Sequence, residues 1–157
     1  MKKNIKIIAI FILLITITSC GFKKINSKDV ILINIVNINI TGEQRIAYYL
    51  KNDILLISNN DSNEKYTLDI KLKKMKNTKI KDTTGKTTRY NVSINASLQL
   101  TNQADNKKTN RNFLQSLDYD VAKVHSDTIK NEKNAVKNIT QTIADDIVSF
   151  ITLMNRK

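Results

Sequence analysis

The fold of this chain is decided by the stretch Tyr90-Asn91-Val92-Ser93-Ile94-Asn95-Ala96-Ser97-Leu98-Gln99-Leu100. Apolar and polar residues alternate along its whole length, which is the period of a β-strand with one buried face. Asparagine, serine and glutamine fill the polar positions, so that face needs no apolar cover. We therefore predict a long strand in a sheet that is covered on one side only.

Three further strands are expected around it. Residues 30–40 form a β-rich run whose second half alternates, with Val36 on the apolar face together with the following isoleucines. Residues 66–73 alternate in the same way. A fourth strand is expected over residues 113–119, although Gln115 interrupts its apolar face.

The segments between these strands contain turn-forming residues. The stretch from Lys76 to Thr87 is polar and basic and contains Gly85, so we expect a hairpin connection there. Asp105-Asn106 is expected in a turn between the third and fourth strands.

Two stretches have the period of an amphipathic helix. Apolar residues recur at helical spacing over residues 43–57, with Thr41 as a candidate N-terminal cap. They recur every three or four positions over residues 128–154, where Ser126 or Asp127 can cap the start.

The predicted order is strand, helix, three strands in a meander, then helix. The first strand–helix–strand unit is expected to be parallel, with a right-handed crossover. Both helices must bury their apolar stripes on the same face of the sheet. This predicts an α+β fold, a two-layer sandwich with two helices packed on one face of a four-stranded mixed sheet.

The N-terminus predicts a bacterial lipoprotein signal peptide. Lys2, Lys3 and Lys6 precede an apolar run over residues 7–17, and small residues stand directly before Cys20. The run is shorter than the roughly 20 residues that a membrane-spanning helix needs. The alternatives are an uncleaved anchor, or an ordinary secretory signal followed by a structural cysteine. We predict cleavage before Cys20 and its acylation with fatty acids such as palmitate.

This prediction sets the expected organisation of the chain. It comprises a signal peptide over residues 1–19, a lipidated tether over residues 20–28 and a single α+β domain over residues 29–157. Gly21 follows the cysteine where an aspartate would favour retention in the inner membrane. We therefore expect a protein that is anchored by lipid to the outer membrane, on the periplasmic side.

Composition limits the classes of partner and of chemistry. The formal net charge is +12, and the chain has one cysteine. Acylation would consume that cysteine, leaving no thiol for a disulfide, a zinc site or catalysis. A basic protein outside the cytoplasm suggests an anionic partner, such as lipid phosphates, lipopolysaccharide or an acidic protein surface. Nucleic acid is not expected as a partner in that compartment.

No pattern in the sequence indicates catalysis or metal binding. The one histidine, His125, stands in a polar segment before the last helix and is expected in a surface loop. No Gly-x-Ser-x-Gly elbow is present, and the carboxylates lack metal-ligand spacing. The adjacent Asp145 and Asp146 are expected on a solvated side of the helix. We expect no enzyme, no metal and no cofactor beyond the covalent lipid on Cys20.

Cations gather between the second and third predicted strands, where only Asp82 opposes them. They are Lys71, Lys73, Lys74, Lys76, Lys79, Lys81, Lys86 and Arg89. They form either a solvated charge run or an anion site at one end of the sheet. The polar face of the third strand also has two interpretations. It is either exposed to water or enclosed in a hydrated cavity, because neutral polar groups can exchange water for other hydrogen bonds at little cost.

Several short motifs give the chain a resemblance to a known family. Cys20-Gly21-Phe22 begins the mature chain, and Thr88-Arg89-Tyr90 begins the long strand. Leu117-Asp118-Tyr119-Asp120-Val121-Ala122 precedes a helix with Asn131-Glu132 and Ala135 near its start. In these motifs and in the order of its elements, the chain resembles the lipopolysaccharide-assembly lipoprotein family LptE, also called RlpB.

The resemblance implies a two-layer sandwich that plugs the outer-membrane β-barrel LptD and helps to deliver lipopolysaccharide to the outer leaflet. The expected lipopolysaccharide contacts are first Arg89, then Lys81 and Lys86 beside the hairpin turn, and Lys130 by resemblance alone. A pilotin-like chaperone lipoprotein of another outer-membrane machine is the main alternative. A lipid-modifying enzyme is a third possibility, which the lack of a positioned base disfavours.

Overall fold

The computed structural model describes residues 33–56, 58–59 and 62–155. They belong to the unit Ile31–Lys157, and only this unit is considered below. The predicted signal peptide, the acylation site Cys20 and the tether lie outside the described residues, and these predictions stay untested.

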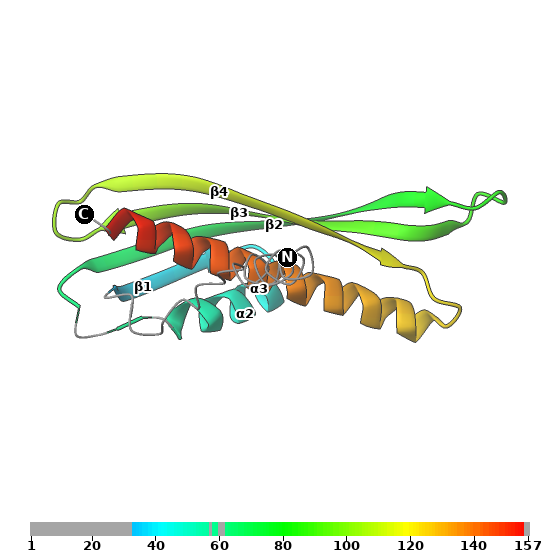
Figure 1. Ribbon diagram of the computed structural model, residues 1–157, viewed down its shortest axis with the longest axis horizontal. Helices are drawn as coiled ribbons and strands as arrows, with labels where there is room; N and C mark the ends of the chain where they lie inside the picture. Colours follow the sequence, from blue (N-terminus) through cyan, green and yellow to red (C-terminus); the bar gives the residue numbers. More distant parts are fainter. Residues whose placement is uncertain (1–32, 57, 60–61, 156–157) are drawn as a thin grey trace, which may run out of the picture. The chain divides into compact units, whose positions relative to one another are not determined.

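A four-stranded sheet forms one layer of the described fold (Figure 1). Its strands lie in the order of the sequence, β1-β2-β3-β4. β1 pairs in parallel with β2, while β2, β3 and β4 form an antiparallel meander, as predicted. Their bounds are Asn34–Thr41 for β1, Lys65–Lys81 for β2, Thr87–Asn102 for β3 and Lys108–Asp120 for β4.

The alternation in β3 is confirmed by the burial of its side chains. Tyr90 is half-buried, and from Val92 onward the apolar positions of the strand are at most 2 % exposed: Val92, Ile94, Ala96, Leu98 and Leu100. On β2, the partners of Leu100, Leu98 and Ala96 are also buried, and they are Leu68, Ile70 and Leu72. One face of the sheet therefore carries the core.

Two helices cover this face, α2 (Gln44–Leu55) and α3 (His125–Asn155), and Figure 1 shows both on the same side of the sheet. Each buries one apolar stripe: Ile46, Leu50 and Ile54 on α2, and Ala135, Ile139, Ile143, Ile147 and Ile151 on α3. The predicted α+β two-layer sandwich is confirmed. In the described part of the chain, no helix is both long enough and apolar enough to cross a membrane.

Gly42 fixes the approach of α2 to the sheet. It joins β1 to α2 with a φ of +113°, a conformation that side chains with a Cβ rarely adopt. A Cβ on this residue would lie 2.2 Å from the carbonyl oxygen of Leu72, well inside contact distance. The turn between β1 and α2 can lie directly against β2 only because residue 42 is glycine.

The predicted face of Val36 is wrong. Its side chain is 52 % exposed, whereas Ile35 and Ile38 are each 6 % exposed. The pairing of β1 with β2 shifts register between Ile35 and Asn37. The extra residue in this bulge turns Val36 outward and returns the following isoleucine to the core.

The hairpin connection is shorter than predicted. β2 runs on to Lys81, which pairs with Thr87 at the start of β3, so much of the expected connection is strand. The turn itself is organised by Asp82, whose Oδ1 accepts hydrogen bonds from the backbone N–H groups of Thr84 at 2.9 Å and Lys86 at 3.0 Å. The hydroxyl of Thr84 holds the pKa of the Asp82 carboxyl below its usual value, with help from these N–H groups.

The predicted cap of α2 is also wrong. The N-cap residue is Glu43 rather than Thr41, and no side-chain hydrogen bond caps the helix. Ile57, expected to end the apolar stripe, lies outside the described residues.

α3 begins earlier than predicted. His125 is its first residue and is exposed, so it does not lie in a loop. Ser126 and Asp127 therefore fall inside the first turn rather than before it. The helix start is tied to the preceding segment by Thr128, whose Oγ1 accepts a 2.9 Å hydrogen bond from the backbone N–H of Ala122.

Gln115 interrupts the apolar face of β4 because it contacts α3. Its Nε2 donates a 2.8 Å hydrogen bond to Oδ2 of Asp146, which is half-buried. The expectation that Asp146 lies on a solvated side is wrong, while the neighbouring Asp145 is exposed as expected.

Candidate functional site

The far end of the β2–β3 hairpin carries the predicted lipopolysaccharide-contact residues Lys81, Lys86 and Arg89. Lys81 and Lys86 flank the turn and are exposed, and neither forms an ion pair with a described residue. Arg89 is half-buried, and its Nε donates a 2.6 Å hydrogen bond to Oδ1 of Asp120 on β4. This bond raises the pKa of Arg89 above its usual value. Two of these cations are therefore available, and the third already has an acidic partner.

Lys130 lies on α3 and is exposed. The structure does not place it on the hairpin, but both elements meet at Asp120. While the carboxylate of Asp120 binds Arg89, its backbone carbonyl accepts a 3.0 Å hydrogen bond from Nδ2 of Asn131, the residue after Lys130.

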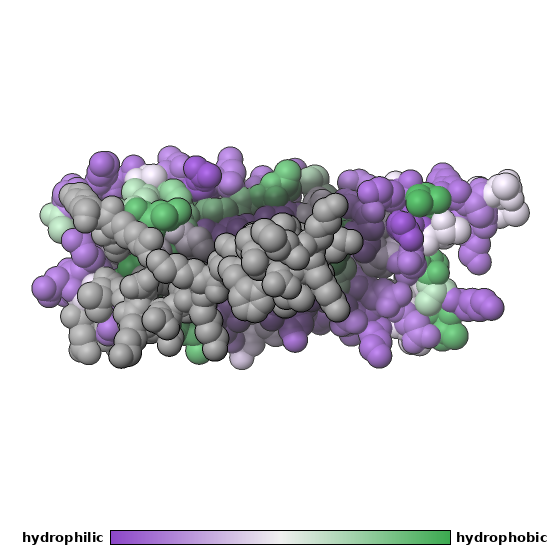
Figure 2. All heavy atoms as spheres, in the orientation of Figure 1, coloured by the Kyte–Doolittle hydropathy of each residue, from purple (hydrophilic) through white to green (hydrophobic). Residues whose placement is uncertain are grey.

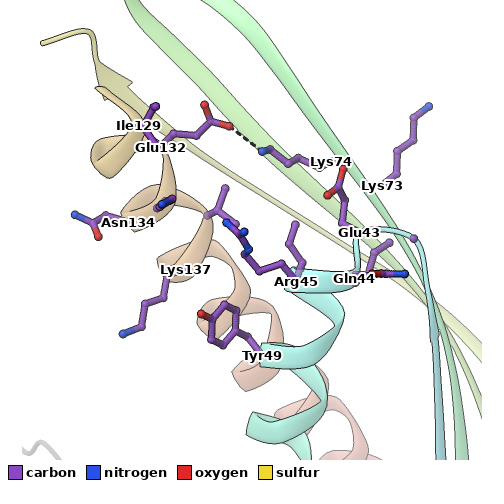
Figure 3. A pocket seen from close by; sticks show the side chains of 15 residues that line it. Glu43, Gln44, Arg45, Tyr49, Lys73, Lys74, Ile129, Glu132, Asn134 and Lys137 are labelled. Carbon is purple, nitrogen blue, oxygen red and sulfur yellow. Dashed lines mark hydrogen bonds and ion pairs between the residues drawn. The ribbon is translucent and has the colours of Figure 1, made fainter. Parts of the chain in front are cut away.

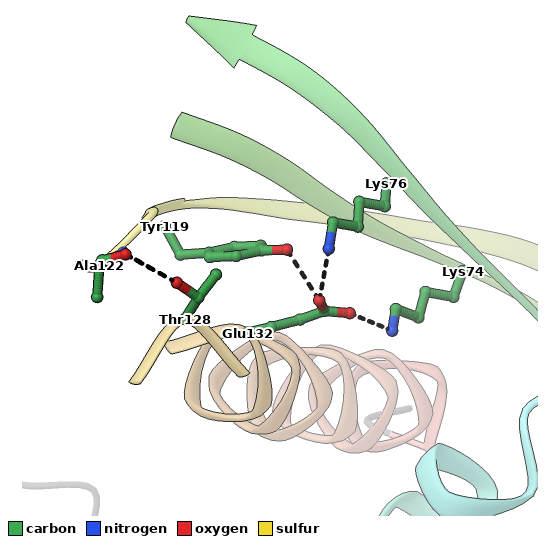
Figure 4. Close-up of polar contacts among 6 residues, drawn as sticks. All are labelled: Lys74, Lys76, Tyr119, Ala122, Thr128 and Glu132. Atoms are coloured by element: carbon green, nitrogen blue, oxygen red, sulfur yellow. Dashed lines mark hydrogen bonds and ion pairs between the residues drawn. The ribbon is translucent and has the colours of Figure 1, made fainter. Parts of the chain in front are cut away.

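A second group of cations converges on Glu132 of α3 (Figure 4). Lys74 Nζ lies 2.8 Å from Oε1 of Glu132, and Lys76 Nζ lies 2.8 Å from Oε2. The hydroxyl of Tyr119 donates to Oε2 at 2.9 Å. Lys76 also lies 4.3 Å from the centre of the Tyr90 ring, which stacks on Tyr119. These five residues, the Glu132 cluster, fasten α3 to the hairpin where the apolar core ends.

Protonation equilibria in the Glu132 cluster follow from this geometry. Burial alone would raise the pKa of Glu132, but the bonds from Lys74, Lys76 and Tyr119 lower it from 4.5 to about 2. Burial alone would lower the pKa of Lys76, but its hydrogen bonds to Glu132 and Tyr119 raise this pKa above its usual value. Burial raises the pKa of Tyr119. Glu132 is therefore a carboxylate and Lys76 an ammonium group at neutral pH.

Asp82 is not the only acid that opposes the predicted basic cluster. Lys79 Nζ lies 2.7 Å from Oδ2 of Asp118, and this bond lowers the pKa of that carboxyl. Asp118, Glu132 and Asp120 together form ion pairs with four of the eight cations in the predicted cluster. The acids come from β4 and α3, so their positions depend on the tertiary fold.

A groove of about 1280 Å³ lies between the first turns of α2, the first half of α3 and β2 (Figure 3). Its apolar lining includes Ile46, Leu72 and Val136. Its cations are Arg45, Lys73, Lys74, Lys133 and Lys137, and its acids are Glu43 and Glu132. We call it the cationic groove.

The cations of the groove are not equivalent. In Figure 3, Arg45 reaches from α2 toward α3, while Lys73 points away from α3. Lys74 is bound to Glu132. Arg45, Lys133 and Lys137 are exposed and have no ion pair with a described residue. Figure 2 shows hydrophilic side chains around the start of α3 and the far end of the hairpin, with hydrophobic ones among them at both places. The apolar part of an anionic amphiphile could pack on the apolar lining of the cationic groove, and its negative groups could lie beside Arg45, Lys133 and Lys137.

The other face of the sheet is polar along β3, as predicted. Neighbouring strands bond to it: Asn91 Nδ2 donates to Asp118 at 2.6 Å, and Gln99 Nε2 donates to Asn110 at 3.2 Å. Among the described residues, only Asn95 has a buried side-chain oxygen without a partner. Its cross-strand neighbour Leu114 is 64 % exposed, so this face is not uniformly polar.

Within the described ranges, no group of three or more histidine, cysteine or acidic side chains could hold a metal ion. Local patterns could have suggested Lys133 and Lys137, which are four residues apart on one helix. No local pattern could have paired Lys74 with Glu132, because the two residues are far apart in the sequence.

The fold defines a class of small two-layer α+β domains that includes several lipoproteins of known structure. The chain is similar to the crystal structure of a candidate lipoprotein from Caulobacter crescentus CB15, with a TM-score of 0.59 and 14 % identity, over 83 % of this chain and 96 % of that one.

It is also similar to the rare lipoprotein B from Shewanella oneidensis, with a TM-score of 0.57 and 12 % identity, over 75 % of this chain and 95 % of that one. An uncharacterized lipoprotein B from Nitrosomonas europaea matches with a TM-score of 0.50 and 12 % identity, over 75 % and 83 % of the chains. No family model matches the sequence, and no curated protein does. The predicted RlpB-like fold is confirmed, and at these identities the likeness concerns the fold alone.

Proposed function

We propose that the chain is an outer-membrane lipoprotein subunit of the lipopolysaccharide transport and assembly machinery. In this proposal, the lipid on Cys20 anchors it on the periplasmic side, and an LptD-type β-barrel encloses it. It acts as a plug and a lipopolysaccharide contact, not as an enzyme, and uses no cofactor. The observation that carries the proposal is the fold that it shares with rare lipoprotein B over 95 % of that chain.

The polar face of the sheet supports enclosure in a hydrated lumen. Its central strand offers neutral amides and hydroxyls, which can exchange water for hydrogen bonds to a partner without burying a charge.

The exposed cations support contact with lipopolysaccharide, whose lipid A and inner core carry phosphates and carboxylates. Lys81 and Lys86 hold two positive charges beside one tight turn, and Arg89 supplies a planar guanidinium that pairs well with phosphate. Arg89 would have to exchange Asp120 for phosphate or bind both. Lys130 and the cationic groove extend the positive surface along α3.

Co-purification tests the partner. After mild detergent extraction of cells, the tagged full-length chain should bring down a large outer-membrane β-barrel protein. A secretin in its place would instead support a pilotin-like chaperone. As a test of the enclosed face, Ser97→Glu should leave the chain folded but reduce recovery of the barrel, because the carboxylate would lose water on insertion. Undiminished recovery would contradict a lumenal position for this face.

Binding to lipopolysaccharide tests the basic hairpin. The variant Lys81→Glu/Lys86→Glu/Arg89→Glu should bind purified lipopolysaccharide more weakly than the wild type, and the difference should shrink as salt is added. A matched control reverses Lys51, Lys107 and Lys108, which changes the net charge equally. Equal loss in both variants would show that overall charge, and not the hairpin, governs binding.

A further inference from the structure

The two edges of the sheet differ in how they are protected. An exposed edge strand presents unpaired N–H and C=O groups, and proteins usually guard such edges with charges, proline or a bulge. β4, at one edge, carries Lys108, Arg111, Asp118 and Asp120. β1, at the other edge, has a bulge at Val36 but no charged residue and no proline along Asn34–Thr41.

The first part of the β1 edge is already occupied. The carbonyl of Ile33 accepts a 2.8 Å hydrogen bond from the backbone N–H of Asn59, and the N–H of Ile35 donates to Ser58 Oγ at 3.0 Å. The segment after α2 thus covers this end. From residue 36 to residue 41, no described residue outside β2 forms a hydrogen bond with the β1 backbone. The open part of the edge begins at the bulge at Val36.

A groove of about 520 Å³ runs beside this open edge, between β1 and α2. The side chains of Ile38, Ile40 and Ala47 give it an apolar lining. Ile40 and Ala47 are only half-buried, although both pack against the core. Tyr48, 65 % exposed, and Lys51, also exposed, border the groove on the helix side. The lining also includes the polar residues Asn39, Thr41 and Gln44, and among the described residues that line the groove Lys51 is the one cation.

We propose that β1 and α2 form a binding site for an extended polypeptide segment of a partner protein. The segment would add to the open edge of β1 as a fifth strand. Side chains alternate across a strand, so every second side chain of the segment would enter the groove over Ile40 and Ala47. When a peptide adds to a sheet edge as a strand, main-chain hydrogen bonds provide the affinity and pockets for its side chains provide the specificity. Lys51 favours a segment with an acidic residue next to the apolar one.

A second copy of this chain is disfavoured as the occupant of the site. α2 packs against the inward face of its own β1. An added β1 would therefore bring its own α2 over the same groove, and both copies of Lys51 would approach one another. The occupant must be a strand whose inward face is free, such as a linear segment or the terminal arm of a partner.

The test is a selection from a displayed library of random peptides on the full-length protein in detergent. Selected peptides should alternate apolar and polar residues and should carry acidic residues. Binding should slow amide exchange at residues 36–41, and Ala47→Trp should weaken it by about tenfold or more, because the indole fills the space that the incoming side chain needs. Asn52→Trp, exposed elsewhere on α2, is the matched control and should have no effect.

Lys51→Glu provides a second test, which cannot disturb the core because this side chain is exposed. The selected peptides should then carry basic residues in place of acidic ones. Peptides that leave exchange at residues 36–41 unchanged, or that bind equally well to Ala47→Trp, would overturn the proposal. Protection of these amides in a dimer without peptide would also overturn it, because a second copy would then occupy the edge.

Discussion

Replacing Gly42 by alanine should destabilise the domain strongly, for two separable reasons. The first is the backbone: an alanine held at a φ of +113° occupies a sparsely populated region, at a cost of about 1–3 kcal/mol. The second is the contact of its Cβ, 2.2 Å from the Leu72 carbonyl oxygen. This obstacle is backbone in the middle of β2, so it cannot rotate away. Relief requires α2 to move off the sheet, which by analogy with overpacked cores costs about 1–3 kcal/mol more.

Gly85 supplies the control. It also has a positive φ, +84°, but no atom lies within 4 Å of the place where its Cβ would stand. Gly85→Ala should therefore show backbone strain alone, about 1–2 kcal/mol. Both substitutions restrict the unfolded chain equally, so this effect cancels when they are compared.

Urea denaturation followed by circular dichroism measures the difference. We expect Gly42→Ala to lose about 1–3 kcal/mol more than Gly85→Ala, with similar m-values. For a domain with a typical stability of about 5–15 kcal/mol, this shift is easily measured. Equal losses at the two glycines would refute the argument that close contact with Leu72 positions α2.

Other expectations follow from the core, the Glu132 cluster and the anchor. Because the folded pKa of Glu132 lies at about 2, below its usual 4.5, the stability that its carboxylate supplies is complete above pH 4.5 and is lost as the pH falls toward 2. Glu132→Gln should flatten this part of the acid dependence in urea titrations, and an unchanged slope would contradict the assignment. Ile94→Ala and Ile143→Ala should each cost about 2–5 kcal/mol, since both side chains are at most 1 % exposed. Asn95→Ala should be neutral or slightly stabilising by the same assay, because it removes a buried oxygen without a partner. Cys20→Ala should leave unprocessed precursor, and mass spectrometry of the wild-type N-terminus should show a lipidated cysteine.

The sheet and its cover could be predicted because their signal is local. β3 alternates without a break, since every inward side chain meets a helix or a buried neighbour. The period of α3 is equally regular from Ile139 to Ile151. In these elements, the pattern of apolar residues matches the packing, so the sequence alone is sufficient to predict the element and its buried face.

The alternation of apolar and polar residues failed to predict the strand where its inward side chains are charged. Past Leu72, the inward positions of β2 are Lys74 and Lys76, which meet Glu132 instead of hydrocarbon. Alternation disappears there although the strand continues to Lys81, so the sequence suggested a loop. The bulge at Val36 could not be predicted from the sequence either, because a run of β-branched residues fits either register of β1 against β2.

The candidate site could be predicted only in part. Lys81 and Lys86 stand beside the turn as expected, because a hairpin brings neighbours in sequence together. The partners of Arg89 and Lys79 lie on β4, and the cationic groove joins α2 to α3. Such contacts depend on the order of strands and the packing of helices, which no short motif records.

The Glu132 cluster has a consequence for the mechanics of the hairpin. Beyond Lys71, β2 has no β1 neighbour, and the far part of the hairpin is joined to the helix layer mainly through this one carboxylate. Dissolved salt screens the ion pairs of this contact, whereas it has little effect on apolar packing. The stiffness of the far part of the hairpin should therefore vary with ionic strength, while the part of the two-layer sandwich that is held by the apolar core keeps its shape.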